Sequence, residues 1–108
     1  MPPVITIASF QPRPERAADV EAALRAAVRA AHTEEGCQLY ALHRTVSEPV
    51  TLVMVEQWSG PEALGAHVAG DAVRAVLATL KDGLAKAPEV LRLAPLPEGD
   101  AKLGQIVP

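Results

Sequence analysis

The chain has 108 residues, of which 10 are Lys or Arg and 13 are Asp or Glu, so its formal net charge is −3. An acidic chain without a run of basic residues binds phosphate backbones poorly, which excludes nucleic acid as an expected partner. No apolar stretch reaches the ~18 residues of a membrane span, and the first residues lack a secretory signal pattern. We therefore expect a cytoplasmic protein without a membrane partner. The single cysteine, Cys37, excludes an intrachain disulfide and any multi-cysteine metal site.

The first two predicted elements are a strand and a helix. Residues 4–10, VITIASF, are rich in β-branched side chains and end at the two prolines of QPRP, which is typical of a strand. Pro14 suits the first turn of a helix, and Gly36 follows its end. Between them an apolar stripe recurs at helical spacing and predicts a helix over residues 14–33; it consists of Val20, Leu24, Ala27, Val28 and Ala31.

Two further strands are expected over residues 37–46 and 51–58. Because side chains alternate across a sheet, Met54, Glu56 and Trp58 should share one face of the later strand. By the same alternation, the face of the earlier strand that carries Tyr40 also carries Gln38, Leu42 and Arg44. If both faces are turned toward the helices, these side chains converge.

The segment SGPE, at the end of the third strand, predicts the start of a helix. Ser59 and Glu62 have the spacing of a capping box, and a proline lies in the first turn. Gly70 closes this short helix. Asp71 is then expected to cap a second helix that continues to about Leu84, where apolar residues again recur at helical spacing.

Residues 89–96, EVLRLAPL, supply the fourth strand and complete the order β-α-β-β-α-β. Right-handed crossovers fold this order into a ferredoxin-like α+β domain, residues 1–96, whose four-stranded antiparallel sheet has helices on one face. The other face would carry apolar side chains such as Val53 and Val55, which predicts a partner. Residues 97–108 are expected to form an irregular tail that either packs on a neighbouring subunit or frays.

Two segments of the chain carry family motifs. Residues 34–44, EEGCQLYALHR, contain the pattern Gly-Cys-x-x-Tyr-x-Leu, and residues 52–70, LVMVEQWSGPEALGAHVAG, contain Glu-x-Trp followed by Glu-Ala-Leu-x-x-His. Both resemble segments of the antibiotic biosynthesis monooxygenase family, and the resemblance covers roughly residues 4–96. It implies a homodimer in which two sheets pack together into an α/β barrel. The partner expected from the apolar sheet face agrees with this.

The resemblance also implies a chemistry, the oxidation of small phenols, quinols or polyketide-like aromatic compounds by O2 without a cofactor. Removing a proton from such a substrate gives an electron-rich anion that reduces O2, so the protein supplies mainly a base and an apolar enclosure. His67, at the edge of a buried helix face, is expected to act as proton acceptor or orienting donor. Trp58 is the second expected catalytic residue and would form a wall against the substrate ring. The residues expected to bind or support the substrate are Tyr40, Glu56, Met54 and Arg44.

Other interpretations fit the same residues. A buried Glu56 needs a partner, and Arg44 on the adjacent strand would make a structural ion pair with it. A non-catalytic dimer that binds a small ligand or serves in stress would keep the fold, and the scarcity of aromatic and polar candidates favours it. A third alternative is a haem-binding or haem-degrading member. Haem-degrading relatives use a histidine on this helix and an asparagine on the first strand, and the absence of asparagine from this chain weighs against it. The three histidines show no metal-binding spacing, so no metal is expected.

Overall fold

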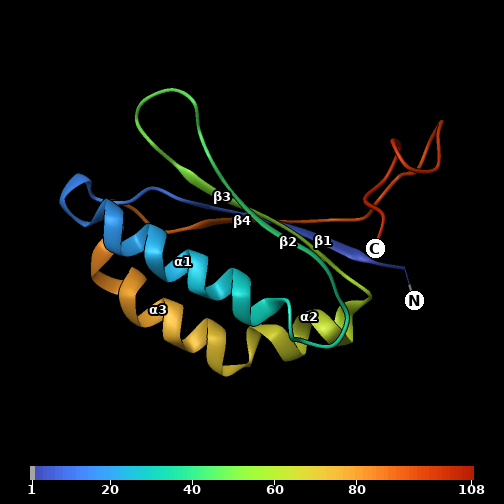
Figure 1. Ribbon diagram of the computed structural model, residues 1–108, viewed down its shortest axis with the longest axis horizontal. Helices are drawn as coiled ribbons and strands as arrows, with labels where there is room; N and C mark the ends of the chain where they lie inside the picture. Colours follow the sequence, from blue (N-terminus) through green and yellow to red (C-terminus); the bar gives the residue numbers. More distant parts are fainter. Residues whose placement is uncertain (1) are drawn as a thin grey trace.

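The computed structural model describes residues 2–108 as one sheet and one layer of helices (Figure 1). The strands and helices follow in the expected order, as β1 (Val4–Phe10), α1 (Ala17–Ala31), β2 (Cys37–Arg44), β3 (Leu52–Trp58), α2 (Pro61–Val68), α3 (Asp71–Gly83) and β4 (Glu89–Leu93). A short 3-10 turn, η1 (Pro14–Arg16), precedes α1. All strand pairs are antiparallel, and their order across the sheet is β2-β3-β1-β4. The predicted ferredoxin-like α+β fold is confirmed.

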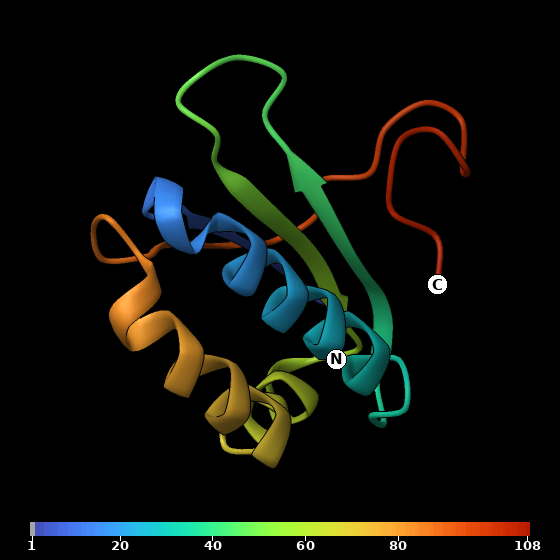
Figure 2. The ribbon, with the colours of Figure 1, turned by 60° about the vertical axis from the view of Figure 1, so that its left-hand side comes forward.

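The helices cover one face of the sheet. α1 and α3 lie side by side and run in opposite directions, while α2 lies near the end of β3 (Figure 2). The apolar stripe of α1 faces the sheet as predicted, since Val20, Leu24, Ala27 and Ala31 are buried. Within residues 2–108, no single helix is long and apolar enough to cross a membrane; α2 and α3 meet that requirement only as a pair bent by 53°.

The predicted capping box at the start of α2 is wrong. Gly60 is the N-cap residue rather than Ser59, and no side chain caps the helix. The cause lies at the end of β3, where the Ser59 N–H donates to the carbonyl of Gly36 at 2.8 Å and so holds Ser59 outside the helix. α3 likewise begins at Asp71 after its N-cap Gly70, so Asp71 contributes negative charge to the first turn instead of a cap hydrogen bond.

β2 contains a bulge that the alternating pattern does not predict. Its register with β3 shifts between Cys37 and Leu39. The shift turns Gln38 toward the helix-free side of the sheet, where its Oε1 accepts a hydrogen bond from Gln57 Nε2 at 2.9 Å. The expectation that Gln38 shares a face with Tyr40 is therefore wrong, although Tyr40 itself is buried as expected.

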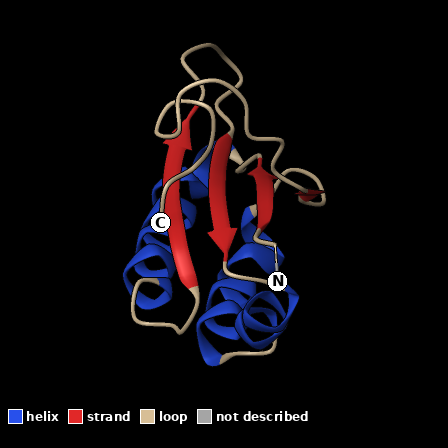
Figure 3. Ribbon diagram, turned by 90° about the vertical axis from the view of Figure 1, so that its right-hand side faces the viewer, coloured by secondary structure: helices blue, strands red, loops and turns tan. Residues whose placement is uncertain are grey.

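The helix-free face carries apolar side chains that the single chain leaves accessible. On β4, Leu91 is 61% exposed and Leu93 is 39% exposed. β4 ends at Leu93 rather than at residue 96, and the chain that follows contains neither helix nor strand. Figure 3 shows the helices behind the strands and the tail returning on the strand side. There Gln57 Nε2 donates to the carbonyl of Ile106 at 3.2 Å, so the tail contacts the sheet of its own chain.

Candidate functional site

Three rings pack together at the end of β3. Trp58 and His67 are stacked, with ring centroids 4.5 Å apart and planes inclined by 29°. Tyr40 meets both rings edge-on, its centroid 6.1 Å from that of Trp58 and 5.3 Å from that of His67. The side chains come from β3, α2 and β2, so tertiary packing brings them together. The predicted convergence of Tyr40, Trp58 and His67 is present in the structure.

A carboxylate that the sequence analysis did not single out holds His67. The imidazole Nδ1 lies 2.8 Å from Oε1 and 3.2 Å from Oε2 of Glu34, in the loop between α1 and β2. Because an ionised carboxylate only accepts hydrogen bonds, Nδ1 donates, and Nε2 keeps a free lone pair in the neutral ring. The Glu34 side chain is 26% exposed and that of His67 is 5% exposed, so this pair links a buried imidazole to the surface.

A second carboxylate, Glu56, lies inside the cluster and is only 5% exposed. Its Oε1 accepts a hydrogen bond from Trp58 Nε1 at 2.9 Å. Burial raises the pKa of Glu56 because the charged form loses its water, and the Trp58 hydrogen bond and the neighbouring basic side chains of His67 and Arg92 only partly offset this. Glu56 therefore holds a proton more readily than a surface glutamate does.

The predicted ion pair between Glu56 and Arg44 is wrong. Within the described chain, Arg44 Nη2 lies 3.2 Å from Oε1 of Glu21, on α1, at the other end of β2. Glu56 is satisfied instead by Trp58, its neighbour two residues along the same strand face. Of the other expected substrate-binding residues, Met54 is buried next to Glu56 along β3, whereas Arg44 lies apart from the rings.

Two hydroxyl-bearing side chains belong to the same layer. Burial raises the pKa of Tyr40, and the nearby carboxylates of Glu56 and Glu34 add to the effect, so its hydroxyl stays protonated and can donate. Thr6, on β1, lies opposite Glu56 in the sheet register. Among residues 2–108, Thr6 Oγ1 is the one buried side-chain polar atom without a hydrogen-bond partner. Buried hydroxyls are normally bonded, so Thr6 marks a place where a partner would be favourable.

The cluster is closed in the single chain. Trp58 is 0% exposed and Tyr40 is 7% exposed, and both lie in the continuous hydrophobic core. A substrate reaches His67 only if neighbouring side chains or the short helix α2 move. Within residues 2–108, no group of three or more His, Cys, Asp or Glu side chains lies in position to hold a metal ion. The described cluster therefore offers a base, two carboxylates and aromatic surface.

Comparison with known proteins assigns the segment that carries this cluster to a family. The family model for antibiotic biosynthesis monooxygenase matches residues 3–79, a segment that contains the whole cluster. Three solved structures are similar. Rv0793 from Mycobacterium tuberculosis has a TM-score of 0.84 and 31% identity, covering 91% of this chain and 99% of that one. PA3566 from Pseudomonas aeruginosa has a TM-score of 0.82 and 27% identity, covering 89% of this chain and 96% of that one.

The third is a proposed antibiotic biosynthesis monooxygenase from Caulobacter crescentus, with a TM-score of 0.78 and 28% identity, covering 88% of this chain and 91% of that one. No protein with a curated description matches the chain by sequence. The similarity thus extends over nearly the full length of each compared structure, so the fold is shared with these domains as a whole.

Proposed function

This chain belongs to the antibiotic biosynthesis monooxygenase family, and from that premise we propose that it oxidises a small phenol, quinol or polyketide-like aromatic compound with O2 and without a cofactor. The observation that carries the proposal is the buried His67, fixed between the carboxylate of Glu34 and the ring of Trp58. A base held in an aromatic enclosure suits removal of a phenolic proton, because desolvation strengthens the interactions that stabilise the resulting charges.

In this proposal His67 takes the substrate proton at Nε2. Its Nδ1 already donates to Glu34, so the lone pair of the neutral ring lies on Nε2. When Nε2 gains a proton, the imidazolium forms 2.8 Å from the Glu34 carboxylate, which stabilises the new positive charge. Glu34 is thus a positioning residue that acts through His67 and does not touch the substrate.

The phenolate then supplies the electrons. It passes one electron to O2, and the resulting phenoxyl radical and superoxide combine at a ring carbon to form a peroxide, which takes the proton back from the imidazolium. Loss of the hydrogen on that carbon together with cleavage of the O–O bond leaves a carbonyl and releases water. One phenol and one O2 therefore give one quinone and one H2O. The substrate is the reductant, so the protein contributes acid–base chemistry and enclosure.

The remaining members of the cluster would hold the ring. Trp58 offers a flat wall, and its hydrogen bond to Glu56 fixes the indole. The protonated hydroxyl of Tyr40 and the free hydroxyl of Thr6 are suited to bonding substrate oxygens. Met54 closes the apolar side, where an unbranched, flexible side chain adapts to different ring shapes.

We propose that the protein works as a homodimer joined through the helix-free face of the sheet. Exposed Leu91 and Leu93 on that face support this, since a monomer leaves them in water. The tail of residues 97–108, which follows the domain formed by residues 1–96, lies at this face through Ile106, so it would also touch the partner. Sedimentation of a Val55→Asp variant tests the interface, since a charge at this position on the face should yield monomers.

We also propose a cytoplasmic location, supported by the lone cysteine.

Oxygen uptake with a panel of quinols and anthrone-like compounds tests the activity. With protein verified free of iron, copper and flavin, we expect uptake coupled to product formation, with one oxygen atom from labelled O2 in the product. His67→Ala should lower kcat by about 10²-fold or more, the scale of general-base catalysis. The control Val68→Ala changes an exposed neighbour on α2 and should leave the rate unchanged. Absence of turnover on every compound, or equal rates for wild type and His67→Ala, would overturn the proposal.

A second function, a non-catalytic dimer that binds a small ligand, is favoured by one observation. The rings of Trp58 and His67 are buried against each other, which leaves the candidate base closed in the single chain. If this function is the true one, the same aromatic compounds should bind with saturation and quench Trp58 fluorescence while oxygen uptake stays at the buffer rate. Quenching accompanied by turnover would reject it.

A further inference from the structure

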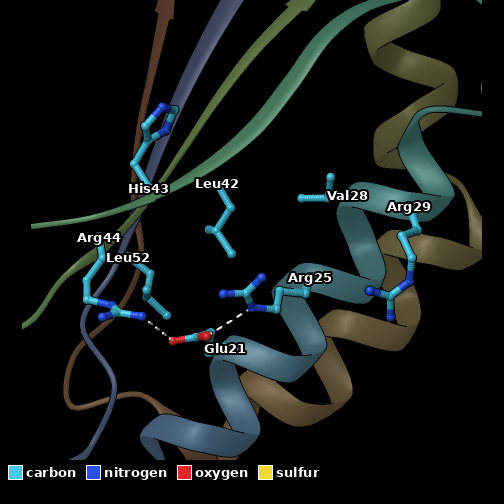
Figure 4. A pocket seen from close by; sticks show the side chains of 8 residues that line it. All are labelled: Glu21, Arg25, Val28, Arg29, Leu42, His43, Arg44 and Leu52. Atoms are coloured by element: carbon cyan, nitrogen blue, oxygen red, sulfur yellow. Dashed lines mark hydrogen bonds and ion pairs between the residues drawn. The ribbon is translucent and has the colours of Figure 1, made fainter.

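A cavity lies at the end of the helix–sheet interface opposite the ring cluster. It has a volume of about 330 Å³ and opens between α1 and the edge strand β2 (Figure 4). Its lining consists of Glu21, Arg25, Val28, Arg29, Leu42, His43, Arg44 and Leu52. The volume lies within the range of about 300–1,000 Å³ typical of small-molecule sites. None of these residues belongs to the ring cluster around His67.

Charge is concentrated on one side of this cavity. Arg25 Nε lies 2.9 Å from Oε2 of Glu21, and Arg44 Nη2 lies 3.2 Å from Oε1 of the same carboxylate. The two guanidinium groups therefore converge on Glu21 from a helix and from a strand, as Figure 4 shows. Arg29 adds a third guanidinium to the lining. Counting the arginine and glutamate side chains of the lining, three positive groups against one negative group leave an excess of two positive charges.

The guanidinium groups are accessible and only partly used. The side chains of Arg25 and Arg44 are 62% and 57% exposed, whereas that of Glu21 is 29% exposed. A guanidinium has five N–H donors, and each of these two arginines uses one of them on Glu21. The free donors can therefore bind an incoming anion from solvent without displacing Glu21.

The opposite side of the cavity is apolar. Leu42 and Leu52 point from the sheet into the space facing α1, and Val28 meets them from the helix (Figure 4). Leu52 is 3% exposed and belongs to the hydrophobic core, so this floor is firmly held. An anion with an apolar body would pair with the arginines and also cover the apolar side chains. Inorganic phosphate would leave those apolar side chains exposed to water.

This cavity is separate from the ring cluster. Leu52 and Trp58 are the first and last residues of β3, and six steps at a rise of about 3.3 Å put them roughly 20 Å apart. Met54, 1% exposed, fills the space after Leu52 along the same face. The two sites therefore belong to opposite ends of one interface.

We propose that the cavity between α1 and β2 binds a small organic carboxylate with an aliphatic or aromatic body. The planar guanidinium groups of Arg25 and Arg44 pair with carboxylates, and Glu21 already shows the geometry in which these arginines hold one. The body of the ligand lies on Val28, Leu42 and Leu52. The overall charge of −3 weighs against a polyanionic partner such as nucleic acid.

Calorimetric titration with sodium hexanoate and sodium benzoate tests the proposal. Hexan-1-ol and benzyl alcohol carry related bodies without the charge, and inorganic phosphate carries charge without the body. We expect saturable binding of both carboxylates with Kd below about 1 mM, and no saturable binding of the alcohols or of phosphate. Phosphate binding as tight as that of hexanoate would overturn the assigned ligand class, and binding of the alcohols as tight as that of the acids would overturn the role of charge.

Single substitutions sharpen the test. Arg25→Gln and Arg44→Gln should each weaken carboxylate binding about tenfold, the scale of a lost charged hydrogen bond. Glu21→Gln should tighten it by about fivefold, because it removes the repelling charge and frees donors. Arg74→Gln removes the same charge from α3, outside the cavity, and should have no effect. Equal carboxylate affinity in all four variants would overturn the assignment of this binding site. Unchanged carboxylate affinity in His67→Ala would show that binding here is independent of the ring cluster.

Discussion

The two ends of the helix–sheet interface hold charged side chains in opposite environments, one buried and one exposed. At the end of β3, the carboxylate of Glu56 is 5% exposed and bound by an indole N–H, next to the imidazole of His67. At the start of β3, Glu21 and two arginines form ion pairs at the surface. At the closed end, burial makes the negative charge of Glu56 costly and favours its protonated form, whereas water screens the charges at the open end.

This difference separates the two proposed tasks. Proton transfer benefits from a dry enclosure in which one base is held in one orientation, and the stacked rings of Trp58 and His67 supply it. Reversible binding of an anion needs accessible donors and fast exchange, which Arg25 and Arg44 supply. Substitutions at the closed end should therefore affect stability and catalysis together, and those at the open end should affect binding alone.

The largest effect is expected for Trp58→Ala. The indole is 0% exposed and packs against Tyr40 and His67, so its removal leaves a large cavity in the core. We expect a loss of about 3–5 kcal/mol in the free energy of unfolding, measured by urea denaturation. The control at the open end, Arg25→Ala, should stay within about 0.5 kcal/mol of wild type. Similar losses for both variants would erase the contrast between the two ends.

The next effect is expected for Glu34→Gln. The amide keeps an acceptor for His67 Nδ1 but lacks the charge that stabilises the imidazolium. We expect kcat to fall by about 10–100-fold with KM nearly unchanged, the usual cost of losing an orienting partner. Glu35→Gln, an exposed neighbour, is the matched control and should retain wild-type kcat. An equal loss in both variants would assign the effect to the loop rather than to the charge on Glu34.

The sequence predicted the elements because their signals are local. The periodic stripe of α1 reflects burial on one side of the helix, and the alternation in β3 assigns Met54, Glu56 and Trp58 to one face; these three side chains are buried together with the stripe. The cap of α2 was mispredicted because Ser59 is tied to Gly36, a contact between segments distant in the chain. The sequence pattern does not predict the bulge at Cys37 either, since a bulge inserts one residue into a strand without changing its composition.

The candidate site was only partly predictable for a related reason. Trp58 and His67 stand out by type and spacing, and the structure brings them together. Glu34 lies in a loop without periodicity, so its bond to His67 depends on how that loop packs on α2. The predicted partner of Glu56, Arg44, is wrong because it lies opposite Leu52 in the sheet register, whereas the indole of Trp58 lies beside Glu56 on the same strand face.

Gly36→Ala tests whether the closed end depends on that loop. Gly36 has a φ of 83°, and an added Cβ would lie 2.5 Å from the Cβ of Ala63 and 2.7 Å from Ser59 Oγ. We expect a loss of about 1–2 kcal/mol in the free energy of unfolding, from the left-handed conformation alone. Gly65→Ala is the control, since its added Cβ meets open space within α2; it should gain about 0.5–1 kcal/mol. Equal stability of Gly36→Ala and wild type in urea denaturation would contradict the prediction.

The smallest expected effect is a change in the pH dependence of stability caused by Glu56→Gln. Burial raises the pKa of Glu56 in the folded protein above its value in the unfolded chain, so folding favours the protonated carboxyl. The stability that comes from this proton is fully present below the unfolded pKa of about 4.3 and is lost as pH rises through the folded pKa.

Urea unfolding between about pH 4 and pH 8 measures this loss. Glutamine cannot ionise but still accepts the hydrogen bond from Trp58, so Glu56→Gln should lose less stability than wild type as the pH rises. Glu62→Gln, at an exposed position of α2, is the control and should follow the wild-type curve. Parallel curves for wild type and Glu56→Gln would show that the closed end does not penalise the charge of Glu56, and the electrostatic contrast with the exposed ion pairs of Glu21 would fail.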